Sequence, residues 1–166
     1  PGNLGNGRTL RVGGTIDMPL TRLGIKGGRL TASGWLRDTS VLDPYTGLRR
    51  SYSGYSNWNA EVGFRQDLGR FAWGVNYYGG PSNTTYRRDE ADTYDGQEPY
   101  LTAFAEYRPT SRTVVKLNLS NLTDLAGLRH RLFYSPDRTN PLPSLVEDRE
   151  RNQHISVGLS VRHSFG

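Results

Sequence analysis

The stretch 155–165 reads ISVGLSVRHSF and alternates between two kinds of residue. Its odd positions carry Ile, Val, Leu, Val, His and Phe, and its even positions carry Ser, Gly, Ser, Arg and Ser. Because successive side chains of a β-strand point to opposite faces of a sheet, this period of two predicts a strand with one apolar face and one polar face. A helix would need apolar residues at every third or fourth position.

The same alternation recurs along the rest of the chain, and no segment of comparable length shows helical spacing. We therefore predict an all-β protein, an antiparallel up-and-down meander of about ten residues per strand. An additional short strand around 128–134 would raise the count from seven to eight. The seven predicted strands cover residues 9–18, 29–37, 57–65, 71–78, 101–108, 115–120 and 154–165.

The connections between the predicted strands alternate in length. Short turns fall at 20–27, 67–70 and 109–112, and long polar loops fall at 39–56, 79–99 and 124–152. An up-and-down sheet places alternate connections at opposite ends, so one end has tight turns and the other has long loops. Transmembrane β-barrels have this asymmetry, with short periplasmic turns and longer extracellular loops, and tilted strands of about 9–11 residues. Aromatic residues also lie toward both strand ends, as in interfacial girdles: Phe71, Tyr107 and Phe165 at one end, Trp58 and Tyr77 at the other.

Composition excludes several classes of protein. The chain has 166 residues and no cysteine, which excludes a disulfide scaffold and a cysteine-ligated metal site. No apolar run approaches the roughly 20 residues of a membrane-spanning helix. The net charge is +5, but the basic residues are spread through nearly every segment, which argues against nucleic-acid binding. The chain begins Pro1-Gly2-Asn3 without a basic and apolar leader, which predicts a mature or truncated product.

Three features near the C-terminus resemble one known family. Residues 117–124, LNLSNLTD, are similar to the end of the penultimate strand of TonB-dependent outer-membrane receptors. The final strand resembles the terminal signal that the barrel-assembly machinery reads in that family, and the loop 129–151 resembles its last, Arg-rich extracellular loop. This sequence differs in having Gly166 after the terminal aromatic residue and a histidine where an aromatic residue is common. The resemblance assigns the assembly signal to Gly158, Val161, His163 and Phe165.

The resemblance implies the C-terminal segment of a receptor β-barrel over residues 1–166, with no internal boundary and without the N-terminal plug domain. It implies the outer membrane of a Gram-negative bacterium and active uptake of an unknown small-molecule substrate. The implied partners are the TonB complex, through the missing N-terminal part, the plug domain, the barrel-assembly machinery, and lipid and lipopolysaccharide. Two alternatives remain open from the pattern alone: a small self-contained outer-membrane barrel with a structural or adhesive role, and a soluble β-sandwich that binds glycans or a protein.

Polar residues at alternate strand positions would face the lumen of such a barrel, where they would hydrate the wall, contact a plug or line a substrate path. No nucleophile motif or phosphate-binding glycine loop is present, so we expect no enzyme, no cofactor and no metal site. The acidic stretch 89–98 has spacings of three rather than the two of an EF-hand loop, which favours a solvated loop over a calcium site. His130 is a further candidate for the substrate path. The lumen-facing candidates are Arg37, Asn57, Glu61, Arg65, Glu106, Lys116 and Asn118.

Overall fold

The computed structural model describes residues 5–95 and 99–165. In this part of the chain the regular elements are strands and a single short 3₁₀ turn, η1 (Thr21–Leu23). None of its helices has the length and hydropathy needed to span a bilayer. The strands are β1 (Gly7–Pro19), β2 (Gly28–Leu42), β3 (Arg49–Arg50), β4 (Trp58–Leu68), β5 (Phe71–Gly79), β6 (Asn83–Tyr86), β7 (Glu90–Tyr94), β8 (Tyr100–Thr110), β9 (Thr113–Ser120), β10 (Ala126–Phe133), β11 (Leu145–Asn152) and β12 (Ser156–His163).

The main sheet is an antiparallel meander with the order β1-β2-β4-β5-β8-β9-β12, and β3 pairs with the upper end of β2. All seven predicted strands are present in this order, so the predicted all-β meander is confirmed. Six of the strands are longer than the alternation indicated, by up to several residues, whereas β12 is shorter than the predicted 154–165. The connection between β4 and β5 is only Gly69 and Arg70, and Gly69 adopts a φ of +63°, a left-handed conformation that favours glycine.

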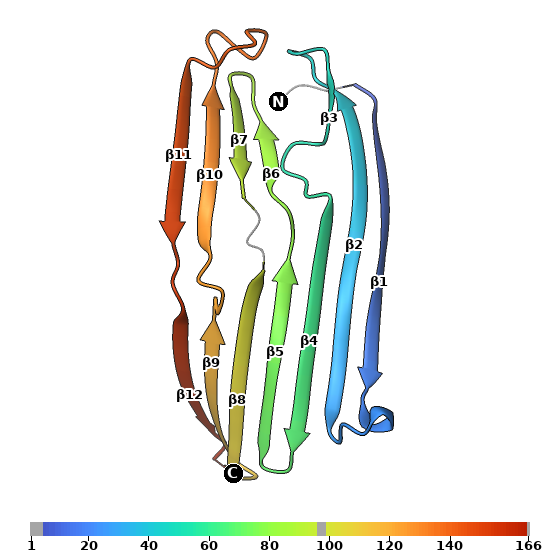
Figure 1. Ribbon diagram of the computed structural model, residues 1–166, viewed down its shortest axis with the longest axis vertical. Coiled ribbons are helices and arrows are strands. Elements are labelled where there is room, and N and C mark those ends of the chain that lie inside the picture. The colour runs from blue at the N-terminus through green and yellow to red at the C-terminus, as the bar shows by residue number, and fades with distance from the viewer. Residues whose placement is uncertain (1–4, 96–98, 166) are drawn as a thin grey trace.

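A second sheet has the order β11-β10-β7-β6. Figure 1 shows that these strands continue the main sheet upward, with β6 above β5, β7 above β8, β10 above β9 and β11 above β12. The prediction that 79–99 and 124–152 are long loops is therefore wrong for residues 83–86, 90–94, 126–133 and 145–152, which form two hairpin extensions of the wall. The predicted extra strand at 128–134 corresponds to β10, but it lies in this second sheet and does not close the first.

The two ends of the molecule differ as the connection lengths predicted. Figure 1 places the turns β1–β2, β4–β5 and β8–β9 at one end, which we call the tight-turn end. The opposite end, which we call the long-loop end, carries the β2–β4 connection and the tips of the β6–β7 and β10–β11 hairpins.

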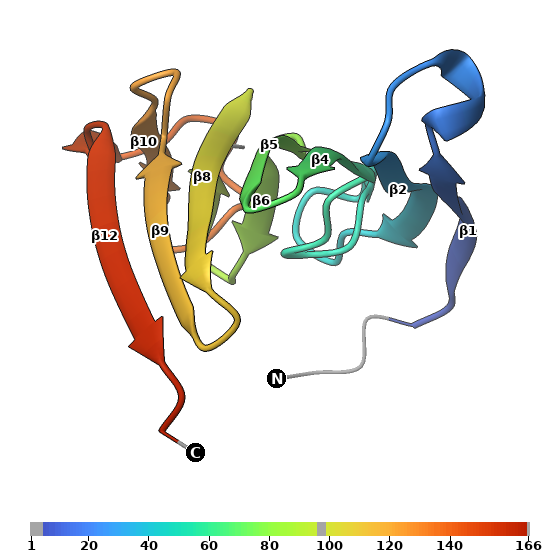
Figure 2. The same ribbon diagram turned by 90° about the horizontal axis from the view of Figure 1, so that it is seen from below.

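The sheet is curved, and its two faces have opposite character. Figure 2 shows the connection between β2 and β4 on the concave side of the main sheet. Within this connection the Tyr52 amide donates to Oγ1 of Thr39, whose side chain lies on the same face as the odd-numbered polar positions of β2. The polar face is therefore the concave face, and the apolar residues of the alternation lie on the convex face.

The convex face exposes its apolar side chains. Val12 is 65% exposed, Leu36 68% and Leu159 72%. Among the described residues the buried hydrophobic side chains are few and small: Leu20, Val41, Ala72 and Ala91. The distribution of apolar side chains in this sheet is thus the reverse of that in a soluble domain, where apolar side chains are buried and exposed apolar patches stay small.

The described sheet is open. β1 pairs only with β2, and β12 pairs only with β9, so neither edge strand meets the other. Over residues 5–95 and 99–165, the strands contact their neighbours within a sheet and do not stack face to face. A two-layer sandwich is therefore not observed, and barrel closure is not observed either.

Candidate functional site

The concave face is where the structure places the polar candidates. In the cross-strand register Arg65 lies opposite Gly74, Gly74 opposite Phe104, and Phe104 opposite Asn118, so these residues share one face. By the same register the other strand candidates lie on this face too, and Asn57 precedes β4 with its carbonyl accepting the amide of Arg37 at 2.6 Å. The residues that share the face are Arg37, Glu61, Arg65, Glu106, Lys116 and Asn118. That this face lines a lumen stays a prediction.

An ion-pair cluster occupies the concave face near the tight-turn end. Arg65 forms a two-point contact with Asp67, with distances of 2.9 Å from Nε and 2.8 Å from Nη2. Nε of Arg108 donates to Glu106 at 2.7 Å, and Glu106 also lies 3.8 Å from Arg65. The side chain of Glu106 is only 12% exposed, so this carboxylate is held by arginines rather than by solvent.

Phe104 is an aromatic residue on this polar face, and two cations explain its position. The guanidinium of Arg65 lies 5.3 Å from its ring centroid and the Lys116 ammonium lies 4.7 Å away. The ring also fills the space that a side chain at Gly74 would need, since a Cβ there would lie 2.5 Å from the ring. Lys116 and Arg65, predicted separately as lumen-facing residues, therefore share one aromatic platform.

A second cationic and aromatic cluster lies closer to the long-loop end. Arg11 and Arg37 are directly opposite each other in the β1–β2 register. Their guanidinium carbons lie 4.8 Å and 4.4 Å from the ring of Trp35, and Arg37 also lies 4.9 Å from the ring of Tyr55. A recess of about 530 Å³ opens beside Arg11 and Trp35, and Asn59 also lines it.

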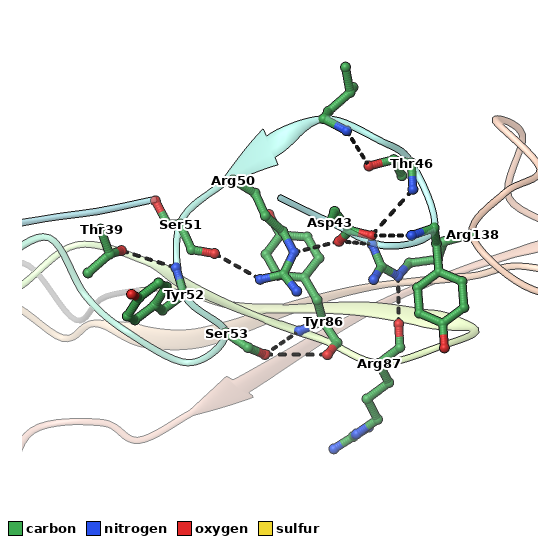
Figure 3. A network of polar contacts seen from close by, with 12 residues as sticks. Thr39, Asp43, Thr46, Arg50, Ser51, Tyr52, Ser53, Tyr86, Arg87 and Arg138 are labelled. Atoms are coloured by element: carbon green, nitrogen blue, oxygen red, sulfur yellow. Dashed lines mark hydrogen bonds and ion pairs between the residues drawn. The ribbon is translucent and has the colours of Figure 1, made fainter. Parts of the chain in front are cut away.

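A buried carboxylate connects the long-loop connections (Figure 3). Asp43, 1% exposed, begins the turn between β2 and β3, and one of its oxygens accepts the amides of Tyr45 at 2.9 Å and Thr46 at 3.3 Å. The other oxygen accepts Nε of Arg50 and Nη1 of Arg138, the latter at 2.8 Å. Burial alone would raise the pKa of Asp43, but the hydrogen bonds from the two arginines outweigh that penalty and hold the pKa well below its usual range.

Arg138 extends this contact to a third connection. Its side chain is 5% exposed, and its Nε donates to the carbonyl of Arg87 at 2.6 Å, while its own amide donates to the carbonyl of Arg88 at 3.1 Å. Tyr86 lies beneath both guanidinium groups, 4.4 Å from Arg50 and 5.3 Å from Arg138. The β2–β3 turn, the β6–β7 turn and the β10–β11 turn are thereby held together. We call Asp43, Arg50 and Arg138 the loop clamp.

The acidic stretch 89–98 is not a solvated loop over the part that is described. Residues 90–94 form β7, and Glu90 is 5% exposed. Arg131 reaches Glu90 at 2.6 Å and Arg129 forms a two-point contact with Asp92 at 2.8 and 2.7 Å. The prediction of a solvated loop is wrong because these arginines pair with the carboxylates across neighbouring strands. Residues 96–98 lie outside the described part of the chain.

His130 lies on the opposite face of the second sheet from that arginine–carboxylate group. Its Nδ1 is 2.6 Å from Asp148, and both side chains are largely exposed. Within residues 5–95 and 99–165, no group of three or more acidic or histidine side chains converges in a metal-binding arrangement. Whether His130 borders a substrate path stays a prediction.

The predicted assembly-signal residues are divided between the two faces of β12. Val161 and His163 lie on the convex face, where Val161 is 65% exposed. The His163 ring packs edge-on against Phe165, with centroids 4.6 Å apart, and its Nδ1 lies 2.9 Å from Oγ1 of Thr113. Gly158 lies on the concave face with open space beside it. Their role in assembly stays a prediction.

Sequence reasoning missed the loop clamp. The run Asp43-Pro44-Tyr45-Thr46-Gly47 carries a local signal, because an aspartate followed by Pro and Gly is typical of a turn whose carboxylate caps nearby amides. Arg138, however, lies 95 residues away and has no local signal.

Comparison with protein-family models, curated proteins and solved structures gave no match. The assignment of function therefore depends on the sequence, the geometry and the charge of this chain itself.

Proposed function

We propose that this chain is part of the wall of a transmembrane β-barrel in the outer membrane, and that the barrel belongs to a TonB-dependent uptake receptor. The exposed apolar convex face is the single observation that carries the proposal. A wall between lipid and a wet interior needs apolar side chains outside and polar side chains inside, which is the distribution of the main sheet.

Two further features support a barrel wall. Among the residues that the structure describes, β1 and β12 each have no strand partner on one side. A soluble protein normally covers or blunts such an edge, and a barrel satisfies it by closure. The alternation of tight turns and long hairpins places all the large connections at one end, as outer-membrane barrels do. The receptor assignment itself comes from the resemblance of residues 117–124, 129–151 and 156–165.

The absence of native cysteine allows a direct test of the two faces. Leu159→Cys and Ser160→Cys are a matched pair, since they are neighbours at the same depth on opposite faces of β12. In outer membranes of a Gram-negative bacterium expressing the full-length protein, we expect a charged, water-soluble maleimide to modify Ser160→Cys and to leave Leu159→Cys unmodified. A lipid-soluble maleimide should reach Leu159→Cys. Equal modification of both by the charged reagent would contradict the proposal.

Fractionation of native cells tests the receptor assignment separately from the barrel. An antibody raised against these 166 residues should detect an outer-membrane band several times heavier than 18.6 kDa. A band near 18.6 kDa in that membrane would identify a self-contained barrel, and a soluble band would overturn both assignments.

A further inference from the structure

The basic residues on the concave face are not all neutralised. Arg29 pairs with Asp17, and Arg65 and Arg108 pair with Asp67 and Glu106. Arg11 and Arg37 lie on the same face but have only aromatic contacts, and within residues 5–95 and 99–165 no carboxylate lies within ion-pairing distance of either. They are therefore a pair of unneutralised cations that lie directly opposite each other. Lys116 and Arg162 also lie on this face without an ion pair among the described residues, but neither is opposite another cation in the register.

Without a counter-ion, the register of β1 and β2 makes this pair of arginines destabilising for the folded protein. Arg11 and Arg37 are directly opposite each other on antiparallel strands, and like charges in that relation are destabilising. Both guanidinium carbons also lie within 5 Å of one indole ring, so the two positive groups gather over a single platform. Cation–π contacts with Trp35 hold the groups in position but do not neutralise their charge.

Glycines shape the space next to the pair. A Cβ at Gly13 would lie 2.8 Å from the Cβ of Trp35, so glycine is required for the indole to lie against β1. Gly14 and Gly34 also border the recess of about 530 Å³ beside Arg11 and Trp35. This volume can accept a small organic molecule, and its walls offer the guanidinium of Arg11, the ring of Trp35 and the Asn59 amide, while Arg37 adjoins the recess through its contact with Trp35.

We propose that Arg11, Arg37 and Trp35 form a binding site for a small multivalent anion, and that the substrate of the receptor carries carboxylate or phosphate groups that bind there. The planar guanidinium groups match both anions, because each presents paired N–H donors to two oxygens. The site lies on the concave face of β1 and β2, and Asp43 of the loop clamp directly follows β2, so a substrate that had passed the long loops would meet it. This inference extends the proposed function by naming the substrate class.

The test uses the full-length protein purified in detergent, with citrate and pyrophosphate as probes in isothermal titration calorimetry at fixed ionic strength. We expect saturable binding of at least one probe, and the tighter probe distinguishes a carboxylate from a phosphate substrate. Arg11→Gln combined with Arg37→Gln should weaken binding at least tenfold, since two charge-assisted contacts are removed together.

The control removes the same number of charges elsewhere. Arg8→Gln combined with Arg29→Gln deletes two arginines that already pair with Asp38 and Asp17, and it should leave the affinity within about twofold, because these charges are locally neutralised. Equal loss in both double variants, or no saturable binding of either probe to the native protein, would overturn the inference. Neither result would affect the cysteine-labelling test of the barrel wall.

A third variant reports on the geometry of the site. Trp35→Phe keeps an aromatic platform but removes the indole, so calorimetric binding should persist within about threefold. The change in intrinsic tryptophan fluorescence on anion binding should disappear, although Trp58 and Trp73 remain. A fluorescence change that persists in Trp35→Phe would place the anion elsewhere and contradict the inference.

Discussion

Removal of the Asp43 carboxylate should release the long-loop end while the sheet stays folded. Asp43→Ala leaves the guanidinium of Arg138, whose side chain is 5% exposed, without its anionic partner. Breaking a buried ion pair from one side costs about 3–5 kcal/mol, because an uncompensated charge stays buried. Arg138 keeps its hydrogen bond to the carbonyl of Arg87, so we expect the lower end of this range.

The measurable effect is faster opening of the β2–β3 and β10–β11 turns. A cost of about 3 kcal/mol corresponds to a roughly 100-fold larger open population, at about 1.4 kcal/mol per factor of ten. Hydrogen exchange followed by mass spectrometry should show this acceleration at the amides of Gly47 and Arg138, whose backbone acceptors the substitution leaves in place. Amides in β4 and β5 should exchange as in the native protein.

Two controls separate the clamp from a general loss of charge. Asp38→Ala removes an exposed partner of Arg8 and should change exchange less than about fivefold, since exposed ion pairs contribute about 0–1 kcal/mol. Combining Asp43→Ala with Arg138→Met removes the stranded charge and should recover part of the protection at the amide of residue 138, which donates to the carbonyl of Arg88. Unchanged exchange in Asp43→Ala alone would refute the reasoning.

The remaining predictions concern the pH response, a glycine and the terminal residue. The pKa of Asp43 is lowered in the folded protein, so the stability that this carboxylate gives to the loop clamp is complete above its ordinary pKa of 3.8 and is lost only as the pH falls below that value. Loss of hydrogen-exchange protection at the clamp amides between pH 7 and 5 would contradict this. Gly74→Ala puts a Cβ 2.5 Å from the Phe64 carbonyl and should destabilise the sheet by about 1–3 kcal/mol, measured by heat-induced unfolding on gels, whereas Gly14→Ala, with open space, should have little effect. Deletion of Phe165 should lower the amount of protein in the outer membrane far more than Asn140→Ala, as measured by immunoblot; equal amounts would exclude its role in assembly.

The strands could be predicted because each carries its own signal. A period of two fixes which residues share a face, and the register then follows from tight turns such as Gly69-Arg70. The stacked pair Phe71 and Tyr107, with centroids 4.7 Å apart, shows that two residues predicted on the same face at the same end do meet.

The second sheet could not be predicted in the same way. The sequence of β6 is NTTY and that of β7 is EADTY, so neither has the apolar alternation that marked the other strands. What orders β7 is pairing with β10, where Arg129 and Arg131 meet acidic residues 37 and 41 positions earlier in the chain. Charges paired over such separations leave no periodic pattern in the sequence. For the same reason the contact between Arg138 and Asp43 could not be predicted.

The distribution of neutralised charge along the concave face has a functional consequence. Near the tight-turn end Arg65 and Arg108 are paired, and at the long-loop end Arg50 and Arg138 are paired with Asp43. Between these two groups Arg11 and Arg37 face the concave side directly opposite each other, without any described carboxylate within ion-pairing distance, next to Trp35 and an open recess. An arginine that already pairs with a carboxylate has its charge neutralised by that partner. An unpaired group held in place by an aromatic ring, by contrast, remains available to an anion that arrives from outside.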